Sequence, residues 1–116
     1  MLTKSNRLKN DRDFQKIFKS GRFVSGPFIT LKLAPNKLPV NRFAFVVGVK
    51  VSKRAVKRNL LRRRMREITR KLLPALRGNF DVVMMAKPEA LKTDFQQLES
   101  ELRRSLTKAG LLPAAR

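Results

Sequence analysis

The sequence has no cysteine and no histidine, and these two absences remove several functions at once. Without cysteine no disulfide forms, and without either residue the chain lacks the thiolate and imidazole ligands of most zinc sites. Catalytic arrangements that depend on histidine or cysteine are excluded for the same reason. Ser52 beside Lys53 leaves a Ser–Lys pair open by spacing alone, but a positioned general base is usually needed for catalysis. A binding or structural function is therefore the default.

Acidic residues are scarce as well, with 8 Asp and Glu against 28 Lys and Arg, which gives a net charge of +20. Two-metal phosphoryl chemistry needs convergent carboxylates, whereas Asp11 and Asp13 are two apart and diverge on a helix. The remaining acids have no metal-ligand spacing, at Glu67, Asp81, Glu89, Asp94, Glu99 and Glu101. A glycine-rich phosphate loop of Walker type is also missing. The charge balance favours a polyanionic partner.

Long apolar runs are missing too. The longest, Phe43–Val49, is far shorter than the roughly 20 residues of a membrane span. The first ten residues, MLTKSNRLKN, lack the apolar core of a secretion signal, so we expect a cytoplasmic protein without membrane contact. Apolar content of 42% with eight Phe argues against full disorder. A chain of 116 residues fits one domain over 1–116, with a mobile basic arm at 1–9 and a frayed tail at 111–116.

The stretch Lys50–Lys71 is the most basic part of the chain: eleven of its 22 residues are Lys or Arg, and Glu67 is its only acid. No strong helix breaker falls between Ser52 and Pro74, which predicts a helix. At about 100° per residue, an apolar stripe is formed by Leu61, Met65, Ile68 and Leu72. A second row is formed by Arg58, Arg62, Arg66 and Arg70, with Asn59 and Arg63 beside it.

That arginine row repels itself, because like charges four residues apart destabilise a helix by roughly 0.2–0.5 kcal/mol per pair. A solvated surface helix is one reading, although solvating faces usually mix both signs. Binding of an external polyanion is the other. Guanidinium groups favour it, because they are planar and give forked donors to phosphate oxygens.

The rest of the chain predicts a small α+β domain of three helices and about four strands, in the order α-β-β-β-α-β-α. A helix begins at Asn10 or Asp11 and ends near Ser20, with Gly21 as its cap. The predicted strands are one or two within Phe23–Ala34, the most apolar one at Arg42–Val51, expected to be central, and Phe80–Ala86. Ile29, Leu31 and Leu33 share one face. Pro35–Pro39 is a turn and Lys87–Lys92 a loop. Thr93 with Gln96 is a capping box for a last helix that runs to about Lys108 and ends at Gly110, with Phe95, Leu98, Leu102 and Leu106 inward.

Phe14 and Phe18 lie four residues apart on the first predicted helix, so they share one face. Both side chains can simply pack in the core. The alternative is a stacking surface for unpaired nucleotides, since cations flank the pair at Arg12, Lys16, Lys19 and Arg22.

The segment RNLLRRRMRE at 58–67, preceded by Val51-Ser52-Lys53, resembles the arginine-rich signature of the bacterial ribonuclease P protein component family. Arg7-Leu8 and the segment DFQKIFKSG at 13–21 are similar to the beginning of that family. FDVV at 80–83 and Lys87-Pro88 are similar to its last strand and exit loop. The resemblance covers about residues 5–108. Leu60, Leu31 and Ala86 depart from the residues that are frequent at their positions.

The resemblance implies a protein cofactor of a catalytic RNA that, with Mg²⁺, cleaves precursor tRNA to release the 5′ leader. It implies no catalytic residue, metal or cofactor on the chain itself. The expected partners are ribonuclease P RNA, one protein to one RNA, and precursor tRNA, without a protein homo-oligomer. The family fold also has a left-handed β-α-β crossover, against the usual right-handed preference.

Two sets of site residues follow from the resemblance. Those expected to contact the catalytic RNA are Lys53, Arg54, Lys57, Arg58, Asn59, Arg62, Arg63, Arg66 and Arg70. Those expected to contact the leader, in a cleft between the first helix and the sheet, are Phe14, Lys16, Phe18, Leu31 and Lys87. A ribosomal or ribosome-assembly protein is the alternative of another class. A DNA-binding or membrane-active basic helix is a third, against which the compact α+β pattern counts.

Overall fold

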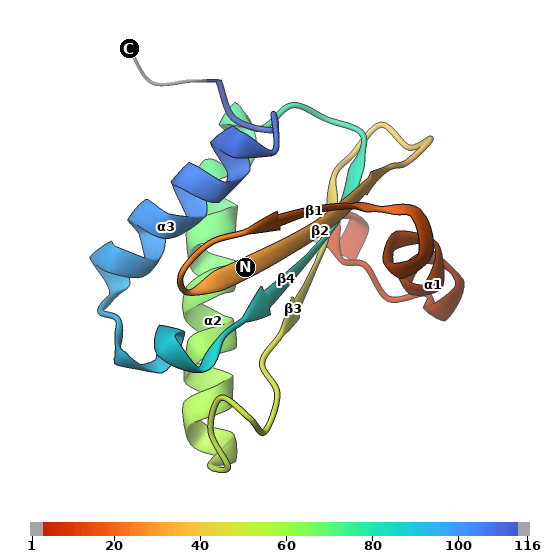
Figure 1. Ribbon diagram of the computed structural model, residues 1–116. Helices are drawn as coiled ribbons and strands as arrows, with labels where there is room; N and C mark the ends of the chain where they lie inside the picture. The colour runs from red at the N-terminus through yellow and green to blue at the C-terminus, as the bar shows by residue number, and fades with distance from the viewer. Residues whose placement is uncertain (1–3, 114–116) are drawn as a thin grey trace.

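The computed structural model describes residues 4–113 and confirms the predicted order of elements (Figure 1). The helices are α1 (Asp11–Ser20), α2 (Ala55–Leu72) and α3 (Phe95–Lys108), and the strands are β1 (Arg22–Ser25), β2 (Ile29–Pro35), β3 (Arg42–Val46) and β4 (Phe80–Ala86). Short 3-10 helices occupy Lys4–Asn6, Leu73–Ala75 and Pro88–Lys92, the last of them where a loop was expected.

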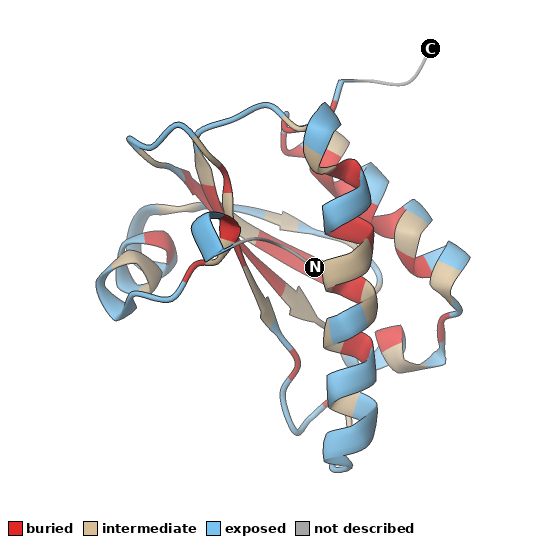
Figure 2. Ribbon diagram, turned by 180° about the vertical axis from the view of Figure 1, so that it is seen from behind, coloured by how far each residue is buried: buried red, intermediate tan, exposed pale blue. Residues whose placement is uncertain are grey.

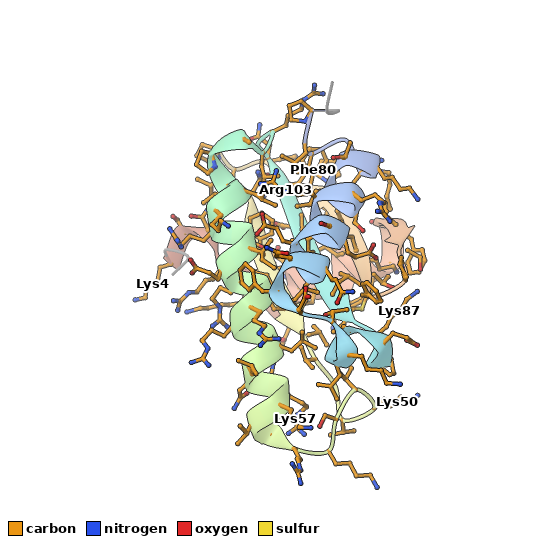
Figure 3. All side chains as sticks on the ribbon, turned by 90° about the vertical axis from the view of Figure 1, so that its left-hand side faces the viewer. Lys4, Lys50, Lys57, Phe80, Lys87 and Arg103 are labelled. Carbon is orange, nitrogen blue, oxygen red and sulfur yellow. The ribbon has the colours of Figure 1, made fainter. Side chains whose placement is uncertain are left out.

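The strands form one mixed sheet in the order β1-β2-β4-β3, in which only β3 and β4 are parallel. Helices α2 and α3 cover one face of the sheet, and α1 lies against the other. The chain passes from β3 to β4 through α2, and this crossover is left-handed (Figures 1 and 3), as the family resemblance implied.

Most of the core lies between the sheet and α2 with α3. The predicted apolar stripe of α2 is buried there, and so are the inward leucines of α3, Leu98, Leu102 and Leu106. A smaller cluster beneath α1 is made by Leu8, Ile17, Ala34 and Val83. Figure 2 shows that the first turns of α2 project past this packed region and are mostly exposed. The domain thus presents the beginning of its most basic helix to its surroundings.

Gly21 caps α1 as predicted and lets it turn directly into β1. Its backbone N–H donates to the Ile17 carbonyl at 2.8 Å. A Cβ at this position would lie 2.9 Å from the Leu33 carbonyl oxygen and closer still to that of Ile17. Only glycine allows the end of α1 to approach β2 this closely.

The strand predicted over Arg42–Val51 is shorter than expected and is not central. It ends at Val46 and lies at the sheet edge, while β4 lies between it and β2. Val47 and Val51 are nevertheless buried in the main core, because the loop that leads to α2 folds over that core. Apolar residues that indicated a long central strand are therefore buried by loop packing.

The prediction of a mobile basic arm at 1–9 is wrong for residues 4–9, the part of it that the structure describes. Leu8 is buried, and its backbone N–H donates to the Phe43 carbonyl at 2.8 Å, which ties the segment to β3. The frayed tail is wrong for Leu111 and Leu112, which are buried in the core. The Leu111 carbonyl accepts from the Arg77 N–H at 2.8 Å. Residues 1–3 and 114–116 lie outside the described residues.

The capping box of α3 lies one residue later than predicted. Asp94 is the cap and exchanges hydrogen bonds with Gln97. The Thr93 hydroxyl instead donates to the Ala90 carbonyl at 2.7 Å. Thr93 thus closes the preceding 3-10 helix and is not free to cap the next one.

Candidate nucleic-acid interface

Three arginines of α2 are half-buried and held along the flank that faces β3. Arg58 Nη1 donates to the Ser52 carbonyl at 3.0 Å, and Arg62 Nη2 donates to the Val47 carbonyl at 3.3 Å. The Arg66 guanidinium lies 5.7 Å from the centroid of the Phe45 ring. A guanidinium has five N–H donors, so one or two internal contacts fix its position and leave most donors available.

Asn59 and Arg63 are exposed beside these arginines. Arg62 Nη1 also donates to Asn59 Oδ1, which links the row to the amide. A shallow hollow along the helix is lined by Val56, Asn59, Leu60, Arg62, Arg63 and Arg66. We call Arg58, Asn59, Arg62, Arg63 and Arg66 the arginine face. The structure brings these five predicted residues together on one side of α2.

The other residues of the predicted RNA-binding set lie at the ends or flank of this face. Arg70 is paired with Glu67, Nε to Oε2 at 3.2 Å, and this hydrogen bond lowers the pKa of the Glu67 carboxyl. Lys53 and Arg54 are exposed and precede the first turn of the helix. Lys57 lines a different hollow, with Ala90 and Leu91. Figure 3 shows it at the end of the molecule where the chain enters α2.

The opposite face of the domain carries aromatic and cationic side chains near α1. Phe18 is 46% exposed. Lys32 on β2 places its ammonium 5.3 Å from the Phe18 ring centroid and donates to the Phe18 carbonyl at 2.7 Å. Phe14 is half-buried and packs against the cluster beneath α1. The two phenylalanines therefore differ: Phe14 mainly packs, and Phe18 is accessible.

The sequence is similar to proteins of one known family. A protein-family model described as Ribonuclease P matches residues 2–110. The chain belongs to the ribonuclease P protein family. It is 36% identical over 112 residues to the ribonuclease P protein component of Chloroflexus aggregans, which covers 96% of this chain and 82% of the relative. It is 38% identical over 117 residues to that of a Synechococcus species, with 97% and 87% covered.

Solved ribonuclease P proteins share the fold. The Staphylococcus aureus RNase P protein superposes with a TM-score of 0.86 at 26% identity, covering 94% of this chain and 99% of the other. The Thermotoga maritima protein gives a TM-score of 0.81 at 28% identity, with 88% and 96% covered. The chain therefore shares the fold of these two proteins over most of its length.

The prediction that Leu31 lies in the leader-binding cleft is wrong. Leu31 is 0% exposed and packs in the main core, on the α2 side of the sheet. Strand side chains alternate, so Thr30 and Lys32 occupy the α1 side. Lys32 is the residue that reaches Phe18 from this strand. The alternation of Ile29, Leu31 and Leu33 in the sequence already indicated that Leu31 lies on the buried face of the strand.

The two predicted lysines of the leader set are placed differently. Lys87 directly follows β4, and its Nζ donates to Ser25 Oγ on β1 at 2.9 Å. Ser25 pairs with Thr30, so this contact lies on the α1 side of the sheet. Asp13 of α1 forms an ion pair with Arg42 on β3. Lys16 is exposed and lies three residues after Asp13, so it is on the same side of α1 as Asp13. The structure therefore does not bring Lys16 together with Phe18.

Phe23 on β1 was missed. It is 62% exposed, and it lies opposite Lys32 in the antiparallel register of β1 and β2. Partners in such a register share a face of the sheet, so Phe23 belongs to the same surface as Lys32. The sequence shows an aromatic residue in a short strand but not the partner across from it.

The described residues contain no group of three or more acidic side chains placed to hold a metal ion. Within residues 4–113, no helix is both long and apolar enough to span a membrane. 

Proposed function

We propose that this chain is the protein component of ribonuclease P, which binds the catalytic RNA through the arginine face and thereby supports removal of the 5′ leader from precursor tRNA. The observation that carries the proposal is the arginine face itself: Arg58, Arg62 and Arg66 are each positioned by a carbonyl or a ring. Positioned guanidiniums lose less conformational freedom when they meet phosphates. The family membership supports the same function.

The sheet surface near α1 receives the unpaired leader. Phe18 and Phe23 are exposed rings on which bases stack, at about 1–3 kcal/mol per base. Lys32 and Lys87 supply charge for the phosphates. Lys32 pairs with Val83 of β4, four residues before Lys87, so the two lysines are about 13 Å apart along the strand. That span accommodates an extended segment of single strand.

The RNA subunit performs the cleavage with its own Mg²⁺, and this chain contributes binding and positioning. Its side chains neutralise phosphates, which lowers the repulsion between the two RNAs. We further infer that one chain binds one RNA without forming a homo-oligomer, and that it acts in the cytoplasm.

The test is reconstitution with a bacterial ribonuclease P RNA at low Mg²⁺, with cleavage of precursor tRNA as the readout. We expect the wild-type chain to restore cleavage. Arg62→Ala weakens affinity for the RNA and reduces the slope of log affinity against log salt by about 1. Phe18→Ala leaves RNA affinity unchanged but reduces the preference for precursor over mature tRNA.

The matched control for both variants is Lys108→Ala, an exposed cation on α3, which should change neither quantity. No stimulation of cleavage by the wild-type chain, together with association with ribosomal RNA at high salt, would instead favour a ribosomal or ribosome-assembly protein. Cleavage by the chain without RNA would also contradict the proposal.

A further inference from the structure

A separate hollow lies between the N-terminal segment, β3 and α2. It is lined by Arg7, Leu8, Lys9, Phe43, Ala44, Phe45 and Arg66, and we call it the edge hollow. Among these residues only Arg66 belongs to the arginine face, so the edge hollow extends that face across the edge of the sheet. The lining includes three cations and no acid, which favours an anionic occupant.

The floor of the edge hollow is an exposed strand edge. The N-terminal segment pairs with β3 at Phe43, where the Leu8 N–H donates to the Phe43 carbonyl at 2.8 Å. Within residues 4–113, no other strand pairs with β3 on this side. Peptide groups alternate in direction along a strand, so those of Phe45 point to the same side as those of Phe43. The hollow therefore offers one N–H and one carbonyl beyond the point where the N-terminal segment pairs.

The side chains above this edge suit a nucleobase. Phe45 is half-buried, and the Arg66 guanidinium lies 5.7 Å from its ring centroid. Aromatic rings and guanidinium planes are the surfaces on which proteins stack unpaired bases. Arg7 and Lys9 form the facing wall, and a backbone N–H and carbonyl match the donors and acceptors of a base edge.

We propose that the edge hollow binds one unpaired nucleotide of the RNA subunit, next to the RNA helix that lies on the arginine face. The base stacks against Phe45 and Arg66, its polar edge meets the Phe45 peptide groups, and its flanking phosphates meet Arg7 and Lys9. This inference rests on the proposed function, because the same RNA occupies both surfaces. An added peptide strand fits less well, since β3 ends at Val46 and offers little free edge beyond Phe43.

Site-specific cross-linking in the reconstituted complex tests this placement. Lys9 is exposed, so Lys9→p-benzoylphenylalanine places a photoreactive group at the rim without disturbing the core. The same replacement at Lys108, on α3, is the control. We expect the Lys9 variant to cross-link to one or two unpaired nucleotides that the Lys108 variant does not reach. Cross-links only to paired nucleotides, to a polypeptide, or in the pattern of the control would overturn the inference.

A second measurement uses the nucleotide so identified. Removing its base should weaken binding of the wild-type chain roughly tenfold, the loss of one stacked base. Arg66→Lys keeps the positive charge but removes the planar guanidinium group on which a base can stack. This variant should weaken binding of intact RNA by a similar factor. For the variant, removing the base should then cost little more, because the two changes remove one interaction. If instead removing the base weakened binding of the Arg66→Lys variant by as large a factor as it weakens binding of the wild-type chain, the inference would be overturned.

The two proposals fail differently. If the wild-type chain neither binds nor stimulates the RNA, the proposed function itself is wrong. If it binds and stimulates, but the Lys9 variant reaches no unpaired nucleotide, only the edge hollow is wrongly assigned.

Discussion

Glu67 is the residue that limits the positive charge at the far end of the arginine face. Its carboxylate accepts hydrogen bonds from Arg70, and that contact lowers its pKa while raising the pKa of Arg70. The pair therefore exists at neutral pH. A lowered carboxyl pKa means that its contribution is present above the ordinary value and is lost as the pH falls through the lowered one.

Glu67→Gln should strengthen binding of ribonuclease P RNA. Arg70 is then free to meet a phosphate, and one more phosphate contact steepens the slope of log affinity against log salt by about 0.9. The measurement is RNA affinity at several salt concentrations. Glu99→Gln is the control, because Glu99 also has a lowered pKa, through Lys71, but it lies on α3 away from the arginine face. Equal strengthening by both variants would mean that only net charge matters.

At the scale of elements, α1 is held against the sheet by a small apolar cluster, by the hydrogen bond from Lys32 to the Phe18 carbonyl and by an ionic network. Arg42 on β3 binds Asp81 of β4 through Nη2 at 2.7 Å and reaches Asp13 of α1 at 3.0 Å. The hydrogen bond with Asp81 raises the pKa of Arg42. The network fixes α1 against the sheet, and with it the position of Phe18 relative to Lys32.

Asp13→Asn should therefore loosen α1 without affecting α2, which lies on the other face. The pair is partly exposed, so we expect a loss of about 0.5–1 kcal/mol in the free energy of unfolding. The preference for precursor over mature tRNA should fall, while RNA affinity is unchanged. Asp11→Asn is the matched control, since it removes the same charge from the same helical turn without a partner on the sheet. A similar loss of preference in both variants would exclude the network as the cause.

The elements that were predicted correctly carry local signals. The polar cap at Asn10 and the glycine at 21 bound α1, and the apolar period of α2 identifies its buried side. The length and position of β3 were predicted wrongly because an apolar sequence indicates that residues are buried but not which element covers them. Val47 and Val51 are buried in the core by the loop that leads to α2 and not by a neighbouring strand. Leu8 and Leu111 gave no signal, since a single apolar residue has no period.

The candidate site divides in the same way. The arginine face was predictable because every member lies on one helix, where spacing alone fixes direction. The α1-side surface was not, because the pairing of Phe23 with Lys32 depends on a register between strands. The family resemblance placed Leu31 in the leader-binding cleft, whereas its alternation with Ile29 and Leu33 placed it on the buried face of the strand. The structure agrees with the alternation.

At the scale of the whole molecule, a net charge of +20 on 116 residues opposes folding through self-repulsion. Salt screens such repulsion, with a Debye length of about 10 Å at 0.1 M and about 3 Å at 1 M. The melting temperature of the free chain should therefore rise with sodium chloride. Thermal unfolding followed by circular dichroism measures this directly.

The complex with RNA should respond with the opposite sign. A bound polyanion stabilises the folded chain by about 2.7 kcal/mol at a free concentration of 100 Kd, and salt raises Kd steeply because the contacts are to phosphates. The melting temperature of the complex should thus start above that of the free chain and fall with salt until the two curves meet. Parallel rising curves would show that RNA is held mainly by contacts other than ion pairs, since neither phosphate neutralisation nor counterion release would then govern binding.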